Sequence, residues 1–260
     1  MKIDLTGKKA LVGGASGGLG KAIAVQLAAC GASVTLMARN EEKLNTALKG
    51  LRTEEGQRHQ VLVADFAAPD FQQKVETWFS KNSVDVLVNN TNGPAAGGVL
   101  QKGPHDYAQA FDLLFQTVCA TTLAALPHMQ QQGWGRIINV VSLTVREPVA
   151  HLALSNTVRA SIIAWAKTLS NEVAAGGITV NSILTGYFDT ERLTSLMGLQ
   201  AEASGKTVDE IKTGMVERIP AKRLGRPEEY GHLVSFLASD YAAYMTGVSL
   251  PLDGGLIRGV

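Results

Sequence analysis

The sequence predicts an α/β protein with a doubly wound, seven-stranded parallel sheet and helices on both of its faces. Three observations indicate this fold class. Short runs rich in β-branched residues alternate with longer amphipathic segments along the whole chain. Most of these runs are continuously apolar, as in strands that helices cover on both sides. No repeat, low-complexity tract or Pro/Gly/Ser-rich linker interrupts the alternation, so we expect a single domain over residues 1–260.

The first half of the chain contains four strand–helix units. The first expected helix follows a glycine-rich turn and stops at Gly31, a plausible C-cap. The second begins at Asn40 as N-cap, has an acidic first turn, and its pattern runs to residue 56. The third follows Pro69, and a long fourth helix runs from about Asp106 to Gly133. The expected strands of the whole chain are residues 9–13, 33–38, 59–64, 84–89, 135–141, 178–184 and 247–252.

The second half repeats the alternation with one exception. A helix is expected from about Leu152 to Gly176–Gly177, between the fifth and sixth strands. Residues 187–220 are irregular and follow the sixth strand, at the carboxyl edge where open α/β sheets bind ligands. This insertion is either a lid over a substrate site or a surface helical excursion. Its apolar residues form either an apolar mouth or the cores of helices; they are Phe188, Leu193, Leu196 and Met197.

Composition excludes several function classes. The chain has 260 residues, 45% of them hydrophobic, and a net charge of +1, so nothing favours binding to nucleic acid or to an anionic membrane. Cys30 and Cys119 have no metal-type spacing, and we expect both to be reduced and buried in a cytoplasmic protein. We expect no signal peptide, no metal site, and no stretch approaching the roughly 20 apolar residues of a membrane span.

The turn after the first strand, "VGGASGGLG", has the spacing of a phosphate-binding loop. Gly14, Gly18 and Gly20 allow a sharp turn and a close approach of the backbone to a diphosphate at a helix N-terminus. Ser16 adds a hydroxyl. Glycine clusters also serve ordinary tight turns, but the position between the first strand and first helix favours dinucleotide binding.

The end of the second strand bears on which dinucleotide binds. A protein that prefers NAD usually carries an acidic residue there, whereas this chain has Ala38 followed by Arg39. A guanidinium suits a 2′-phosphate, so NADP(H) is favoured over NAD(H), unless Arg39 is a solvated surface residue. Asp65 is placed to accept from the adenine amino group. Asn89 and Asn90 either line the adenosine ribose or cap a strand end.

These segments together resemble the short-chain dehydrogenase/reductase family, and within it the 3-oxoacyl-(acyl-carrier-protein) reductases, over nearly the whole chain. "GGASGGLG" is similar to the family's TGxxxGxG, "VNNTNG" to its NNAG, and "GITVNSILTGYFDT" to its VNxxxPGxxxT, with Thr185 in place of proline. "GRIINVVS" resembles the strand that leads to the catalytic serine, here Ser142. The resemblance implies a Rossmann fold with cofactor contacts at Gly14, Ser16, Gly17, Gly18, Leu19, Gly20, Arg39, Asp65, Phe66, Asn90, Gly186 and Thr190.

The remaining catalytic positions depart from the family pattern. YxxxK is expected thirteen residues after the serine, where this chain has Ser155 and Arg159. The helper asparagine falls at about Leu114, and neither Tyr107 nor Tyr187 has the spacing to substitute.

The residues at the two altered positions can still stabilise the carbonyl oxygen of a substrate. Ser155 is a poor general acid, because an aliphatic hydroxyl titrates far above a phenol. It can donate a hydrogen bond with Ser142, while Arg159 stabilises a developing alkoxide or holds the nicotinamide ribose. Proton delivery falls to water or, more weakly, to His151. Alternatively, Ser155 and Arg159 are packing and surface residues of an interface helix.

Three functions follow. The first is an NADP(H)-dependent oxidoreductase that reduces a ketone of the 3-oxoacyl-thioester type, with Ser142, Ser155 and Arg159 as its catalytic residues. The second is a catalytically impaired NADP(H)-binding sensor or scaffold. The third, a dehydratase, epimerase or lyase, has no positive support. The resemblance also implies a homotetramer formed through two helices that contain residues 110–126 and 159–173, whose apolar excess either forms that interface or packs on the sheet.

Overall fold

Seven parallel strands form one sheet in the computed structural model, which describes residues 2–259. The order β3-β2-β1-β4-β5-β6-β7 places β1 beside β4 and reverses the direction of winding there, which confirms the doubly wound fold. All seven predicted strands are present. They are β1 Lys9–Gly13, β2 Ser33–Ala38, β3 Gln60–Val63, β4 Val86–Asn89, β5 Gly135–Val140, β6 Ile178–Thr185 and β7 Ser249–Leu252.

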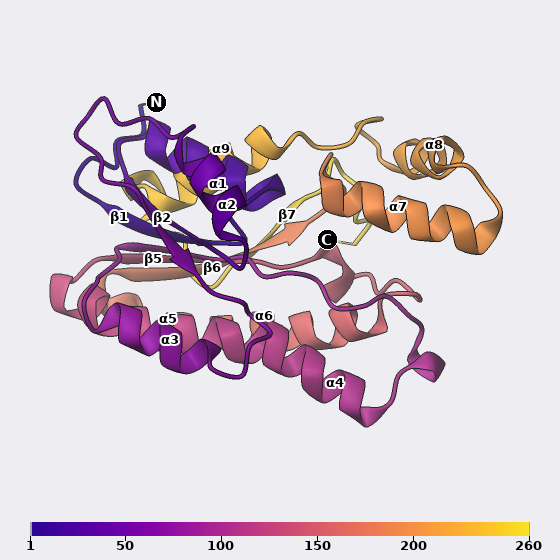
Figure 1. The fold of residues 1–260 in the computed structure, drawn as a ribbon, viewed down its shortest axis with the longest axis horizontal. Helices are drawn as coiled ribbons and strands as arrows, with labels where there is room; N and C mark the ends of the chain where they lie inside the picture. Colours follow the sequence, from indigo (N-terminus) through magenta and orange to yellow (C-terminus); the bar gives the residue numbers. More distant parts are fainter. Residues whose placement is uncertain (1, 260) are drawn as a thin grey trace.

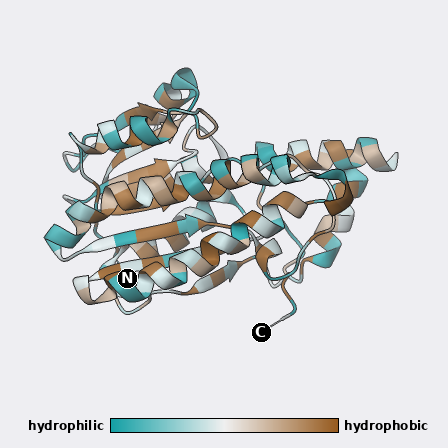
Figure 2. Cartoon of the chain, turned by 90° about the horizontal axis from the view of Figure 1, so that it is seen from below, coloured by the Kyte–Doolittle hydropathy of each residue, from teal (hydrophilic) through white to brown (hydrophobic). Residues whose placement is uncertain are grey.

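Helices cover both faces of this sheet, as Figure 1 shows. One layer contains α1 Gly18–Ala29, α2 Glu41–Leu48 and α9 Pro227–Ala238, and the other contains α3 Phe71–Phe79, α5 Thr117–Gln132 and α6 Ala153–Val173. Neighbouring strand residues enter opposite cores: Val12 packs on the α1 side and Leu11 on the α5 side. The strands are accordingly mostly apolar between helices of mixed character (Figure 2).

The predicted long helix is continuous but not uniform. It begins with α4 at Pro104–Phe111, passes through a π-helical turn at Asp112–Gln116, and continues as α5. A π-turn adds one residue to a helical turn and is frequent beside functional sites. Here it lies at the level of Leu114, where the family resemblance places the helper asparagine.

This helix corrects the expectation about membrane spans. Residues Pro104–Gln132 contain an 18-residue window of mean hydropathy 1.3, so by length and composition the helix could cross a membrane. In the fold it packs against α3, α6, β4 and β5, and 44% of that window is buried within the protein. Its apolar residues therefore serve the core on one side, which a count of hydropathy alone does not distinguish from a span.

Two predicted features of the first half differ in the structure. The second helix ends at Leu48 rather than near residue 56, because the Gly50 N–H turns back to the Ala47 carbonyl and closes the last turn. Cys30 and Cys119 are free, as expected, but both are half-buried rather than buried.

The two long helices α5 and α6 end next to each other at the amino edge of the sheet. Gly133 and Gly177 follow them in the left-handed conformation, with φ of 63° and 72°. A Cβ on Gly177 would lie 2.2 Å from the Gly133 carbonyl oxygen, so glycine is required at this close approach. The strands β5 and β6 start directly after these glycines and pair from Gly135 with Ile178.

Residues 187–220 form two helices, α7 Glu191–Ser204 and α8 Val208–Arg218, beyond the end of the sheet (Figure 1). They enclose a small core of their own that includes Leu193 and Met197, while Phe188 packs against Tyr230 in the main core. The helix-core interpretation is thus confirmed for Leu193 and Met197, whereas Phe188 belongs to the main core and Leu196 is half-buried. Whether the α7–α8 pair acts as a lid stays a prediction.

Candidate functional site

The glycine-rich turn lies between β1 and α1 and packs tightly against the chain after β4. A Cβ on Gly13 would lie 2.6 Å from the Asn90 carbonyl oxygen, and one on Gly14 would lie 2.7 Å from the Asn90 side-chain nitrogen. A Cβ on Gly20 would lie 2.3 Å from the Gly14 carbonyl oxygen. Close approach of the backbone therefore requires glycine at positions 13 and 20, whether or not a ligand is present, and the positive φ of 59° favours it at Gly14.

The N-terminus of α1 is open toward solvent. Gly17 is its N-cap, has a fully extended backbone and has no side chain that could cap the helix. A Cβ added at Gly17 would have no neighbouring atom within 4 Å. The first-turn N–H groups from Gly18 to Gly20, Leu19 among them, have no intrahelical partner and are not capped by a side chain. An uncapped helix N-terminus with free space in front of it fits a diphosphate.

The loop after β6 meets this turn from the other side. The Thr190 side chain lies 3.6 Å from the position that a Cβ of Gly18 would occupy, and its hydroxyl accepts from the Leu193 N–H as N-cap of α7. Gly186 lies against β7's end, since a Cβ there would be 2.5 Å from the Asp253 Cα. Both residues thus lie at the same sheet edge as the glycine-rich turn, as the resemblance implies.

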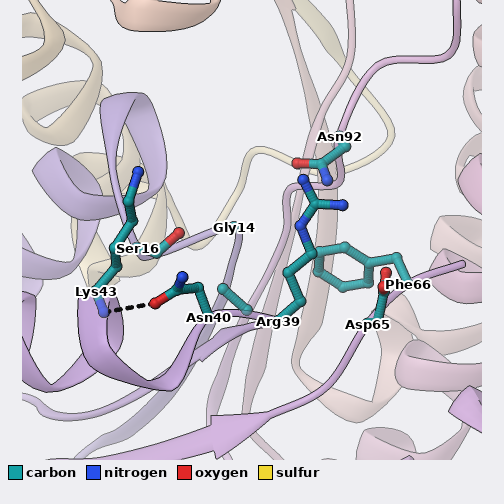
Figure 3. A pocket seen from close by; sticks show the side chains of 9 residues that line it. Gly14, Ser16, Arg39, Asn40, Lys43, Asp65, Phe66 and Asn92 are labelled. Atoms are coloured by element: carbon teal, nitrogen blue, oxygen red, sulfur yellow. Dashed lines mark hydrogen bonds between the residues drawn. The ribbon is translucent and has the colours of Figure 1, made fainter. Parts of the chain in front are cut away.

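A cavity of about 200 Å³ opens beside the turn, at the ends of β2 and β3 (Figure 3). The structure brings five of the predicted cofactor residues together in its wall, namely Gly14, Ser16, Arg39, Asp65 and Phe66. Figure 3 shows Ser16 and Lys43 at one end and the Arg39 side chain directed toward Asn92 at the other. Prediction from sequence missed four wall residues, namely Ala38, Asn40, Lys43 and Asn92.

Lys43 is the most consequential of the missed residues. It lies in the first turn of α2, where its N–H donates to the Asn40 Oδ1 at 2.8 Å. Lys43 lines the cavity together with Arg39, so the cavity wall has two cations. The signal was a lysine three residues after an N-cap. A lysine at that position alone indicates an ordinary helix residue exposed to solvent.

The carboxylate and amide side chains at the strand ends are partly engaged in the fold itself. Asp65 Oδ1 accepts from the Ala67 N–H at 3.1 Å. The Asn90 side chain donates to the Gly13 carbonyl at 3.0 Å, and buried Asn89 donates to Thr122 and Asn139. Both asparagines therefore tie strand ends together, which is the alternative that the sequence left open for them.

The predicted catalytic residues lie at the same carboxyl edge, after β5 and on the first turns of α6. The Ser142 hydroxyl accepts from the Thr144 N–H at 3.2 Å, and both Ser142 and Ser155 are half-buried. Neither serine hydroxyl donates a hydrogen bond to any group within residues 2–259. Both O–H groups are therefore available to an incoming oxygen atom.

Arg159 is a buried residue rather than a surface one. Its side chain belongs to a residue with only 8% exposure, and Nη1 donates to the Val140 carbonyl at 2.9 Å. Burial lowers the pKa of the Arg159 guanidinium to about 10, an effect that Tyr230 partly offsets and Arg192 adds to. The group remains protonated at neutral pH, so the site contains a permanent positive charge.

Neither Leu114 nor His151 is placed to substitute for the missing acid. Leu114 is fully buried in an apolar cluster with Leu154 and Val158. His151 is exposed, and its carbonyl accepts from the Gly97 N–H at 2.7 Å. Within residues 2–259, no group of three or more His, Cys, Asp or Glu side chains is placed to hold a metal ion.

Comparisons with known proteins agree with this arrangement. The family model described as enoyl-(acyl carrier protein) reductase matches residues 14–257. The 3-oxoacyl-(acyl-carrier-protein) reductase FabG of Rickettsia conorii is 32% identical over 255 residues, which cover 98% of this chain and 99% of that protein. The L-sorbose reductase of Gluconobacter frateurii, solved with NADPH and L-sorbose, superposes with a TM-score of 0.92 at 27% identity over the full length of both chains. An NAD⁺-bound xylitol dehydrogenase superposes at 0.88 with 27% identity, over 96% and 99% of the two chains.

Proposed function

The chain belongs to the short-chain dehydrogenase/reductase family, as a 3-oxoacyl-(acyl-carrier-protein) reductase-like member, and we propose that it is an NADP(H)-dependent oxidoreductase that reduces a ketone to an alcohol through an atypical active site. The first substrate class to test is a 3-oxoacyl thioester, which the names of the curated relatives suggest. The observation that supports the proposal best is the open glycine-rich turn on the same sheet edge as Ser142.

The residues of the cavity fit the adenosine half of NADP(H). Arg39 and Lys43 supply two positive charges for a 2′-phosphate, and Ser16 supplies a hydroxyl. The first-turn N–H groups of α1 suit the diphosphate, and the Gly186–Thr190 segment suits the nicotinamide end. When bound, this cofactor supplies the hydride. Preference for NADP(H) over NAD(H) is our own inference, since the similar solved structures include both kinds of complex.

The protein's part in the reaction is to hold the carbonyl oxygen and stabilise its charge. Ser142 and Ser155 donate hydrogen bonds to that oxygen, and the Arg159 guanidinium stabilises the negative charge that develops on it. No side chain in this trio releases a proton at neutral pH, because serine and arginine both titrate far above it. Water therefore delivers the proton to the alkoxide.

The sizes of the two contributions to the rate indicate that turnover survives without the tyrosine that acts as general acid in the family. A positioned general acid contributes roughly 10²–10⁴ in rate, whereas alignment of two bound reactants contributes about 7–11 kcal/mol. Binding of the cofactor and the substrate side by side supplies the second and larger contribution without an acid. We therefore expect slow but measurable reduction.

The test is oxidation of NADPH by the pure protein with a panel of 3-oxoacyl thioesters, diketones and sugars, followed at 340 nm. Oxidation above the protein-free background supports the proposal. Binding of NADPH without turnover of any of these compounds contradicts it, and absence of NADPH binding contradicts every function that uses the cofactor cradle.

A catalytically impaired NADP(H) sensor or scaffold is the second candidate. The burial of Leu114 in an apolar cluster favours it, because nothing polar at that position can relay a proton. Tight NADPH binding in a fluorescence titration, together with no turnover, is the result that this candidate requires.

We also propose a homotetramer, located in the cytoplasm. Half-buried aromatic residues lie on α4, on the π-helical turn and on α6, where Phe115 is stacked on Phe111 and edge-on to Trp165, and Leu123 of α5 is 54% exposed. An apolar helix face of this kind suits contact with a second copy. Light scattering after size-exclusion chromatography measures the mass, and a monomer would rule the tetramer out.

A further inference from the structure

The guanidinium of Arg159 is a buried positive charge for which residues 2–259 supply no negative partner. The residue is 8% exposed, and the only hydrogen bond that its side chain makes within residues 2–259 goes to the Val140 carbonyl. No ion pair in that part of the chain involves it. Burying a charge without a counter-charge is strongly unfavourable, because protein dipoles replace only part of the lost hydration.

The charged and titratable neighbours of Arg159 do not compensate it. Tyr230 faces it, but burial raises the pKa of that phenol, which therefore stays neutral. The other charged neighbour is Arg192, a second cation, whose Nη2 donates to the Pro94 carbonyl at 3.3 Å. The region accordingly has an excess of positive charge that no group within residues 2–259 balances.

This charge lies where a substrate would bind. Val140 is the last residue of β5, two residues before Ser142, and β6 beside it ends at Thr185, whose hydroxyl contacts Tyr230. The remaining Arg159 nitrogens have no hydrogen-bonding partner in residues 2–259, yet none is among the fully enclosed unpaired polar atoms there. They therefore border accessible space at the carboxyl edge of the sheet.

We infer that Arg159 binds a carboxylate of the carbonyl substrate, so that the protein reduces oxo acids in preference to neutral ketones and thioesters. The inference rests on the proposed function, since it names the substrate class of the same site. A carboxylate is a monoanion with two oxygens in a plane, which matches one guanidinium in charge and in shape. The hydroxyls of a nicotinamide ribose are neutral and leave the charge unbalanced.

The experiment compares matched pairs of substrates, each an oxo acid and its methyl ester, with the carboxyl group one, two or three carbons from the ketone. For the wild-type protein we expect kcat/KM to be roughly 10–100-fold higher for the acid of at least one pair, the range for a buried charge-assisted contact. In Arg159→Met this ratio should fall to near one, and in Arg159→Lys it should be partly retained. Arg58→Met, which removes an exposed arginine, should keep the wild-type ratio.

A second readout does not depend on turnover. In the presence of NADP⁺, an oxo acid should raise the melting temperature of the wild-type protein more than its ester does, and Arg159→Met should abolish that difference. Equal rates and equal thermal shifts for acid and ester overturn the inference while leaving the proposed reductase intact. If no compound is reduced, the proposed function fails, and the thermal shifts alone decide whether the carboxylate site exists. If the Met variant does not fold, the wild-type ratio decides.

Discussion

The hydroxyl of Thr185 lies 2.9 Å from the phenol oxygen of Tyr230. Tyr230 is fully buried in the core between α9, α1 and the sheet, so Thr185 is the partner that satisfies its O–H group there. The family pattern has proline at position 185, which would leave the phenol unpaired. The two residues are therefore coupled. Burial raises the pKa of Tyr230 more than the Thr185 hydrogen bond and the Arg159 guanidinium lower it, so the phenol stays neutral.

Replacing Thr185 by Val should lower the free energy of unfolding by about 1–3 kcal/mol, because it leaves a buried hydroxyl without a partner. Adding Tyr230→Phe should recover part of that loss, giving a coupling energy of about 1 kcal/mol in a double-mutant cycle. Urea unfolding of the four proteins measures it. Tyr244→Phe, at a fully exposed tyrosine, is the control and should have no effect. Additive losses would show that the contact carries no free energy.

Two glycines of the glycine-rich turn between β1 and α1 should respond differently to substitution. Gly17→Ser should keep or slightly raise stability, by about a few tenths of a kcal/mol, because serine is a good N-cap and nothing lies within 4 Å of its Cβ. It should nevertheless weaken NADPH binding at least roughly tenfold, since the new hydroxyl takes the N–H groups that a diphosphate needs. Fluorescence titration and urea unfolding separate the two effects.

Gly20→Ala is the matched contrast. Its Cβ would meet the Gly14 carbonyl at 2.3 Å, so both stability and NADPH affinity should fall. If Gly17→Ser bound NADPH as tightly as the wild type, the diphosphate would have to lie elsewhere.

Removing the two cations of the cavity should erase the preference between cofactors. Arg39→Ala with Lys43→Ala should raise the Kd for NADPH by roughly 10–100-fold and change the Kd for NADH little, since only NADPH carries the 2′-phosphate. Titrations at low and high salt should show a weaker salt dependence in the variant. Lys74→Ala, on α3, serves as the control. An unchanged ratio of the two Kd values would mean that Arg39 and Lys43 are solvated surface residues.

Introducing the family's tyrosine and lysine at positions 155 and 159 should restore a general acid to the site. In Ser155→Tyr with Arg159→Lys, a phenol with a nearby ammonium should raise kcat for a neutral ketone by roughly 10²–10⁴. The variant should also acquire a pH dependence of kcat that the wild type lacks, because a titrating group would enter the reaction. Ser155→Phe with Arg159→Lys adds the ring without the hydroxyl and should show no gain. Equal rates in the two double variants would argue against serine as the reason for slow turnover.

The Glu229 carboxylate should make stability depend on acid pH. Hydrogen bonds from the Arg223 guanidinium, joined by the Arg226 N–H, lower the pKa of Glu229 from 4.5 to about 2. A group with a lowered pKa stabilises the fold above its unfolded pKa and loses that contribution as the pH falls through the folded one. The stability difference between wild type and Glu229→Gln should therefore shrink between pH 4.5 and 2. A difference independent of pH would show that the ion pair contributes nothing, as is common for exposed pairs.

The strands and the glycine-rich turn could be predicted from sequence alone, and the reason is physical. Continuous apolar runs leave few alternatives to buried parallel strands, and the glycine spacing reflects close contacts that any side chain would break, as Gly20 shows. The end of the second helix was missed because the helical pattern continues past Leu48, and only the turn at Gly50 ends it. The burial of Leu193 and Met197 was left open, since it requires that α7 and α8 pack on each other.

The parts of the site that sequence did not predict depend on contacts between distant segments. Tyr230 follows Thr185 by 45 residues, and nothing in the pattern of α9 distinguishes its phenol from an ordinary core residue. The burial of Arg159 was equally hidden, because a basic residue on an amphipathic helix is usually solvated, whereas here it reaches the end of β5. These contacts can be identified only from the folded structure, because they join segments that are distant in the sequence.

The adjoining helix ends at Gly133 and Gly177 have a consequence for the opposite side of the molecule. They start β5 and β6 level with each other, and the two strands stay in register up to Val140 and Ile183. Ser142 and Thr185 consequently emerge at matching heights. One inserted residue in either strand would shift its exit by about 3.3 Å and turn its side chains to the other face. The relative height of Ser142 and Thr185 is thus determined a full strand length away, by the two glycines at the amino edge of the sheet.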